Sequence, residues 1–208
     1  AIPPRYEGGF LTPVGVTGDG VVVHINDSGV YEQHDDLSGR MVAEYGNAAN
    51  PHGTHVAGII LGEGYADIGD TLANGDWIYG LGVAPEAEYV DEHYSCAPST
   101  CTKHADDNDA NVSSNSWGDV SGGSFRYGYG YTSNARTWDG LVPDADTFQN
   151  GAQPLTIVSA AGNGGSSAET IVDPWEAKNV VSVASSLNWR NSSGYPGSGN
   201  IHSISSFS

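Results

Sequence analysis

The clearest apolar run along the chain is GVVVHIN at residues 20–26, which stops at the turn-forming Asp-Ser-Gly. Four further segments have the character of strands: residues 87–92 after a turn at Ala84-Pro85, 111–118 ending at a glycine, 155–165 and 177–186. Short apolar runs between turn signals are typical of strands that are buried in a parallel sheet. We therefore expect five strands at these places.

The segments between these runs differ in character. Residues 52–62, HGTHVAGIILG, combine small and aliphatic residues that suit a helix packed tightly on a sheet, and residues 135–152 show helical spacing interrupted by Pro143. Residues 63–80 and the Gly/Tyr-rich residues 119–134 predict loops. Residues 102–111 are polar and predict either a weak helix or a loop.

Strands separated by helix-length segments indicate parallel pairing with helical crossovers. The predicted fold is therefore α/β, with a doubly wound, mostly parallel sheet and helices on both faces. No internal repeat and no convincing linker divides the chain, so we expect residues 1–208 to form a single domain.

Charge narrows the classes of partner. The chain has 25 acidic and 7 basic residues, a formal net charge of −18, and such a surface repels nucleic-acid phosphates and anionic lipid. Either adaptation to high salt or ordinary acidic drift accounts for this charge. No apolar run approaches the roughly 18 residues of a membrane helix. The opening AIPPRYEGG has no initiator Met or signal peptide, so we expect the processed start of a secreted protein.

The two cysteines lie close together in CAPSTC, as Cys96 and Cys101. The Pro-Ser-Thr between them can turn, so a small disulfide loop is expected. A metal knuckle that includes His93 and His104 is the weaker alternative, because the surroundings are typical of a single surface loop.

Polar residues follow several predicted strands, at the sheet edge where working residues of parallel sheets collect. Asp27 follows the first strand, Asn163 follows the strand near 155, and His52 begins a predicted helix. Each residue alone is more often a turn former or a cap. Together they suggest acyl transfer, in which Asp orients His, His moves a proton and the Asn amide stabilises an oxyanion.

Four segments, VVVHINDSGV, HGTHVAGII, NSWG and SAAGNGG, resemble in order the signature segments of the subtilisin-like serine proteases. The resemblance runs from about residue 15 to the end of the chain. It implies a secreted endopeptidase in which Asp27 is the triad carboxylate, His52 the general base and Asn163 the oxyanion donor. It makes His55 a structural helix residue.

The same resemblance assigns the walls of the substrate cleft. Ser116, Trp117 and Gly118 match one side, and Ala160, Ala161 and Gly162 match the other wall of the pocket for the side chain before the scissile bond. The backbone of both segments could pair with an extended peptide or unfolded protein. Their small residues leave room for a sizeable apolar side chain.

The family's nucleophile is a serine in a Gly-Thr-Ser-Met-Ala segment, and these 208 residues contain no such segment. The only Gly-Thr is Gly53-Thr54, and there is no G-x-S-x-G sequence. The serine is supplied by a second chain, by sequence beyond residue 208, or by neither if the protein is a non-catalytic peptide-binding or structural relative. The intact Asp27, His52 and Asn163 favour the first two, and this chain alone should be inactive.

The resemblance also implies a structural calcium ion, with Asp36 in QHDDL as one ligand; the partner loop differs from that of relatives. No cofactor is required for the chemistry. Acidic stretches offer other calcium ligands, although most are expected to be solvated surface. A transition-metal site at His52 and His55 is weaker, because H-E-x-x-H is absent. The acidic candidates are Asp67, Asp70, Asp76, Asp106, Asp107, Asp109, Asp144 and Asp146.

Overall fold

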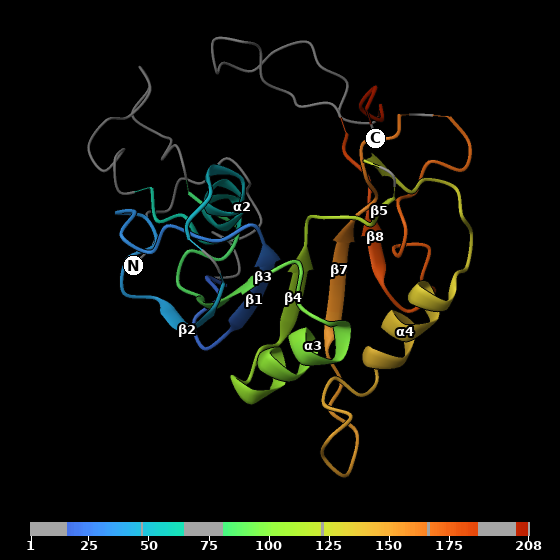
Figure 1. The fold of residues 1–208 in the computed structure, drawn as a ribbon. Coiled ribbons are helices and arrows are strands. Elements are labelled where there is room, and N and C mark those ends of the chain that lie inside the picture. Colours follow the sequence, from blue (N-terminus) through green and yellow to red (C-terminus); the bar gives the residue numbers. More distant parts are fainter. Residues whose placement is uncertain are drawn as a thin grey trace. The chain divides into compact units, whose positions relative to one another are not determined.

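A computed structural model describes residues 16–46, 48–64, 81–121, 123–165, 167–186 and 203–207 (Figure 1). The chain forms two compact units, residues 1–114 and 115–208, and each is described by itself. Most of the excursion predicted at 63–80, with Asp67, Asp70 and Asp76, lies outside the described residues. The expectation of a single domain stays a prediction.

The first unit contains a parallel sheet. Its neighbouring strands are β2 (Met41–Tyr45), β3 (Glu88–His93), β1 (Val22–Asp27) and β4 (Val112–Asn115), in that order. β3 pairs in parallel with both β1 and β2. The strands predicted at 20–26, 87–92 and 111–118 correspond to β1, β3 and β4 to within a few residues. The sequence pattern missed β2, because its residues are exposed or half-buried and show no apolar run.

Helix α2 (Pro51–Leu61) begins where the sequence predicts a helix. The Asn50 side chain caps it by accepting from the backbone N–H of His52 at 3.0 Å, and Pro51 occupies the first turn. Its fully buried Ala57 and Leu61 belong to the same core cluster as Val23, Ile25 and Tyr89 of the sheet. The small residues of this helix let it pack closely on the strands.

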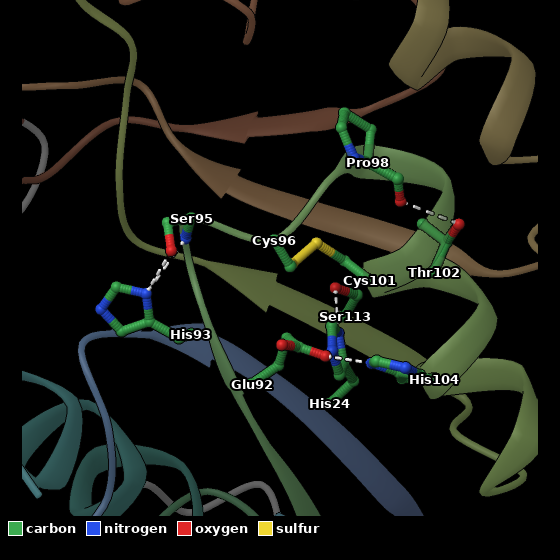
Figure 2. The surroundings of a disulfide bond; sticks show 10 residues. All are labelled: His24, Glu92, His93, Ser95, Cys96, Pro98, Cys101, Thr102, His104 and Ser113. Atoms are coloured by element: carbon green, nitrogen blue, oxygen red, sulfur yellow. Dashed lines mark hydrogen bonds and ion pairs between the residues drawn. A yellow bond between two sulfur atoms is a disulfide. The ribbon is translucent and has the colours of Figure 1, made fainter. Parts of the chain in front are cut away.

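Helix α3 (Pro98–Asp107) covers the other face of this sheet. Nδ1 of His104, on this helix, lies 2.6 Å from Oε2 of Glu92 on β3 (Figure 2). Successive strand residues face opposite sides, and Glu92 lies in register with Asn26 rather than with Ile25, which packs towards α2. The sequence predicted a weak helix or a loop at 102–111, and the helix is correct but begins four residues earlier.

Cys96 and Cys101 form a disulfide with their Cα atoms 5.8 Å apart (Figure 2). The bridge was expected, but the description of CAPSTC as a surface loop is wrong. Pro98 begins α3 and Cys101 is buried inside it. Proline suits the first helical turn, where its missing N–H has no helical partner, so the same residue that suggested a turn starts the helix.

The second unit contains β5 (Val120–Ser121), β6 (Ser124–Phe125), α4 (Ser133–Leu141), β7 (Thr156–Ala160) and β8 (Val181–Val183). β7 and β8 pair in parallel, and β5 and β6 form an antiparallel hairpin. The loop predicted over residues 119–134 is therefore wrong in part, because it contains this hairpin and the start of α4. Two-residue strands are too short to show an alternating pattern.

Helix α4 ends before Pro143, as its interrupted spacing predicts. Thr132 caps it by accepting from the backbone N–H of Ala135 at 3.0 Å. Its buried Trp138 contacts Trp117 and Trp175, with ring centroids 5.7 and 5.1 Å away. This aromatic cluster forms much of the core of the second unit. No helix in the described ranges is long and apolar enough to cross a bilayer.

Candidate functional site

Asp27 and His52 lie in direct contact in the first unit. Asp27 ends β1 and His52 lies in the first turn of α2, and Nδ1 of His52 is 2.7 Å from Oδ1 of Asp27. The Asp27 side chain is 2% exposed, whereas that of His52 is 61% exposed. A carboxylate at Nδ1 favours the tautomer that carries its proton there, so Nε2 is left as the proton acceptor.

The loop that follows Asp27 fixes this pair. Oδ1 of Asp27 also accepts from the backbone N–H of Ser28 at 2.7 Å and from its hydroxyl at 3.0 Å. The Ser28 hydroxyl oxygen accepts in turn from the N–H of Gly53 at 3.2 Å. A Cβ at Gly53 would overlap the carbonyl group of Gly29, so only glycine fits there. These contacts hold the Asp-Ser-Gly segment and the His-Gly-Thr segment together.

His55 lies three residues further along α2 and is exposed. Its neighbour Thr54 makes hydrogen bonds instead. The Thr54 hydroxyl accepts from the N–H of Tyr31 at 2.9 Å and donates to the carbonyl of Asn50 at 2.8 Å. The structural role predicted for His55 stays a prediction. Among the described residues, His52 and His55 belong to no group of three or more His, Cys, Asp or Glu side chains that could hold a metal ion.

Another histidine, His24, lies on β1 and is buried away from solvent. Burial, and to a smaller extent His104, lower the pKa of His24 to about 3, and its Nδ1 lies 2.9 Å from the Ser113 hydroxyl (Figure 2). A fully buried pair of this kind cannot reach a substrate, so His24 is a neutral core residue. The sequence had already separated the two histidines, because His24 lies inside the apolar run GVVVHIN whereas His52 begins a predicted helix.

In the second unit, the two predicted pocket walls meet at Val172. Ser116, Trp117 and Gly118 follow β4, whereas Ala160 ends β7 and Ala161 and Gly162 follow it. A Cβ at Gly118 would overlap the Val172 side chain, and one at Gly162 would lie 3.0 Å from it. Val172 is buried, so it occupies space between the walls.

Val172 therefore packs against both wall segments. The room for a sizeable apolar side chain between them stays a prediction. Val172 lies more than fifty residues from Gly118 along the chain, in a segment without a recognisable pattern. Only the fold brings it to the walls.

The wall backbone is also partly occupied. The N–H of Ala161 donates to the carbonyl of Val183 at 2.9 Å, and the carbonyl of Ala161 accepts from the N–H of Val172 at 2.9 Å. The carbonyl of Trp117 accepts from the indole N–H of Trp175 at 2.5 Å. Both backbone groups of Ala161 therefore already have partners, and the pairing of an extended peptide with the two wall segments stays a prediction.

Asn163 follows Gly162, whose φ of +106° is a left-handed conformation that favours glycine. The backbone N–H of Asn163 donates to the hydroxyl of Tyr127 at 3.3 Å, and Asn163 is exposed. The Tyr127 ring lies close to this turn, because a Cβ at Gly162 or Gly164 would approach it to 3.0 Å. The meeting of Asn163 with the Asp27–His52 pair stays a prediction.

The predicted calcium ligands that the structure describes each have partners of their own. Asp36 is half-buried, its N–H donates to Nδ1 of His34 at 3.2 Å, and its carbonyl accepts from Arg40. Asp107 pairs with Lys103, and Asp146 accepts from the N–H of Phe148 at 2.9 Å. Among the described residues no three or more His, Cys, Asp or Glu side chains are arranged to hold a metal ion. The structural calcium ion therefore stays a prediction, and no step of the chemistry is derived through it.

Comparison with known proteins agrees with this geometry. The model of the subtilase family matches residues 18–208. A psychrophilic protease, S41, is 24% identical over 93% of this chain and 60% of its own, with a TM-score of 0.59. Sphericase is 24% identical over 93% of this chain and 60% of its own, with a TM-score of 0.60.

A cold adapted subtilisin-like serine proteinase is 24% identical over 82% of this chain and 56% of its own, with a TM-score of 0.53. No curated protein sequence matches the chain. The likeness to solved structures at these identities concerns the fold, and it confirms the predicted mostly parallel α/β architecture. The chain spans about 60% of the length of the first two structures.

Proposed function

This chain belongs to the subtilase family of serine peptidases, and from that premise we propose that it is part of a secreted endopeptidase that cleaves extended or unfolded polypeptides. The observation that carries the proposal is the 2.7 Å contact between Nδ1 of the exposed His52 and the buried carboxylate of Asp27. An exposed imidazole held by a buried carboxylate is the arrangement that a general base requires.

The reaction would run through an acyl-enzyme. Nε2 of His52 takes the proton of a serine hydroxyl while the serine oxygen bonds to the carbon of the scissile carbonyl. The Asn163 amide donates to the resulting oxyanion, and Asp27 stabilises the imidazolium. His52 then gives its proton to the leaving amine as the C–N bond breaks. Water, deprotonated by His52, releases the acyl group and restores the serine.

The attacking serine is proposed to lie in polypeptide beyond residue 208 or on a second chain, because these 208 residues lack the family's Gly-Thr-Ser segment. The same absence supports one other candidate, a non-catalytic peptide-binding or structural relative. Intact Asp27 and His52 in hydrogen-bonded contact favour the enzyme, since peptide binding alone needs no oriented imidazole.

The side chain before the cut is proposed to be apolar and of limited size. Gly118 and Gly162 open the walls, but Val172 fills part of the space between them. Secretion is supported by the disulfide between Cys96 and Cys101, because such bonds persist in oxidising compartments. The acidic surface, with a formal charge of −18, makes nucleic acid and anionic membranes unfavourable partners.

The test uses the full-length protein, an apolar peptide substrate and a fluorophosphonate that labels activated serines. His52→Ala should abolish hydrolysis and labelling. His55→Ala is the matched control, since it removes an exposed imidazole from the same helix and should leave both unchanged. Intact-mass measurement of the labelled species identifies the chain that carries the serine.

Binding of the peptide without hydrolysis or labelling would instead establish the non-catalytic relative. Equal activity of wild type and His52→Ala would exclude the proposed base. A structural calcium ion near Asp36 is a separate proposal, tested by comparing Tm with calcium and with a chelator; an unchanged Tm would contradict it.

A further inference from the structure

Asp91 is a buried carboxyl group that the proposed reaction does not use. It lies on β3 with 0% of its surface exposed. Its Oδ2 accepts from the backbone N–H of Val30 at 3.1 Å, and Oδ1 has no hydrogen-bond partner among the described residues. A Cβ at Gly46 would lie 2.6 Å from Oδ2, so the chain closes over the group. A carboxyl buried with one orphaned oxygen is costly and requires an explanation.

The partner of Asp91 belongs to the loop that fixes the proposed catalytic pair. Residues 28–30 follow Asp27 directly. The first binds Asp27 and α2 through its hydroxyl, as described above. The carbonyl of the second, Gly29, accepts from the N–H of Asn50 at 3.2 Å, just before α2 begins. The third, Val30, is held by Asp91 from β3. The loop is thus tied to α2 at one end and to β3 at the other.

We propose that Asp91 is a positioning residue whose carboxylate anchors Val30 and thereby holds Asp27 against His52. Its effect on catalysis rests on the proposed peptidase function, whereas its effect on the geometry of the pair does not. A charged acceptor binds an N–H roughly twice as strongly as a neutral one. This explains why an aspartate, rather than an asparagine, is useful at a buried position.

The electrostatic surroundings of Asp91 make the ionised form of its carboxyl group unfavourable. Burial raises the pKa of Asp91 to about 6, and the N–H of Val30 lowers it in part. The charged side chains that act on it are Glu44 of β2, Glu92 of β3 and Asp27 of β1, all acidic and all raising the pKa. Asp91 in turn raises the pKa of the Tyr89 hydroxyl on the same strand.

The sign of the pH dependence follows. The folded pKa of Asp91 lies above that of the unfolded chain, so the folded state binds the proton more tightly. The corresponding stability is fully present below about pH 4 and is lost as the pH rises through about 6. Above that pH the fold carries an ionised, buried Asp91. Removal of this charge should therefore stabilise the folded protein, and it should also weaken the hydrogen bond from the N–H of Val30.

The first measurement needs no activity. In the full-length protein at pH 8, the low-field proton between Nδ1 of His52 and Asp27 is observed by NMR. Asp91→Asn should shift or broaden this signal, and in wild type the Val30 amide signal should change with a midpoint near pH 6. An unchanged His52 proton signal in Asp91→Asn would overturn the proposal. So would a Val30 amide that shows no transition in wild type, a measurement that requires no variant.

The second measurement compares activity with stability at pH 8. Asp91→Asn should lower kcat about tenfold with little change in KM, which is less than the roughly 10²-fold cost of a 1 Å misplacement. Its Tm should rise by about 2 °C or more at pH 8, and by less at pH 4.5. Glu44→Gln is the matched control, because it removes a nearby exposed charge without touching Val30, and it should change neither kcat nor Tm appreciably.

A parallel fall of kcat and Tm in Asp91→Asn would indicate a purely structural role and overturn the inference. If the full-length wild-type protein hydrolyses no peptide, the proposed function fails, but the NMR comparison still decides whether Asp91 positions His52. The two proposals therefore fail separately.

Discussion

The two units hold their proposed functional residues by different physical means. In the first, Asp27 and His52 are fixed by hydrogen bonds that converge on a buried carboxylate, with Ser28 and the loop to Asp91 as supports. In the second, the walls around Gly118 and Gly162 are fixed by backbone pairing and by close packing on Val172. The first arrangement is sensitive to charge and pH, whereas the second is sensitive to volume.

This difference teaches where each kind of substitution acts. A change of one atom that preserves shape should disable the first unit's pair while leaving its fold intact. The packing of the second unit's walls should respond to a single added or removed methyl group. Five substitutions test the two units, from the largest expected effect to the smallest.

Asp27→Asn should have the largest effect. The side chain keeps its shape, but an amide no longer favours the proton on Nδ1 of His52, so Nε2 loses its role as base. We expect kcat of the full-length protein to fall by about 10⁴-fold. Circular dichroism should report an unchanged fold. Asp35→Asn, at an exposed aspartate, is the control; a similar loss of activity there would show that any loss of carboxylate matters, not the contact with His52.

Asn163→Ala should lower kcat by about 10²–10³-fold, or about 3 kcal/mol in the acylation barrier, with KM barely changed, because the amide is proposed to bind only the transition state. Steady-state kinetics measure this directly. Asn150→Ala, at another exposed asparagine followed by glycine, should have no effect. A large rise in KM at constant kcat would refute the oxyanion role.

Val172→Ala should widen the space between the walls. We expect the ratio of kcat/KM for a Phe-containing peptide over an Ala-containing one to rise about tenfold, which corresponds to about 1–3 kcal/mol for a change of pocket volume. Gly118→Ala is the opposite change: its Cβ would overlap Val172 and should destabilise the unit by about 1–3 kcal/mol. The double variant should recover part of the lost Tm. If it does not, Val172 is not the residue that the Cβ at position 118 meets.

Tyr127→Phe should have the smallest effect. It removes the hydroxyl that accepts from the N–H of Asn163 at 3.3 Å but keeps the ring beside Gly162 and Gly164. We expect kcat to fall less than tenfold, consistent with about 1 kcal/mol for one hydrogen bond. The same substitution in an Asn163→Ala background should have no further effect. Additive losses would mean that Tyr127 acts independently of Asn163.

The parts of the fold that sequence predicted share one property: their local pattern matches their final environment. β1 is buried, and its apolar run shows it, while α2 carries a capping asparagine, a first-turn proline and small residues on its buried face. β2 and the β5–β6 hairpin were missed because exposed or very short strands are stabilised by their neighbours rather than by their own pattern.

The residues of the candidate site also differ in whether their local sequence indicates their role. Asp27 and His52 were predictable because each lies at the end of a strong local element, and the fold brings those ends together at 2.7 Å. Val172, Tyr127 and Asp91 were not singled out. A valine, a tyrosine and an aspartate carry no local signal of their role, which depends on what they touch.

By itself the amino-acid order determined the α/β character, the acidic surface, the Asp and His that face each other, and the absence of the family's Gly-Thr-Ser segment from these 208 residues. Tertiary structure alone decided that Val172 packs against Gly118 and Gly162, that both backbone groups of Ala161 have partners, and that the buried Asp91 binds Val30. The reason is physical: composition and periodicity are properties of neighbouring residues. Steric contact, desolvation and hydrogen bonding between distant residues exist only once the chain has folded.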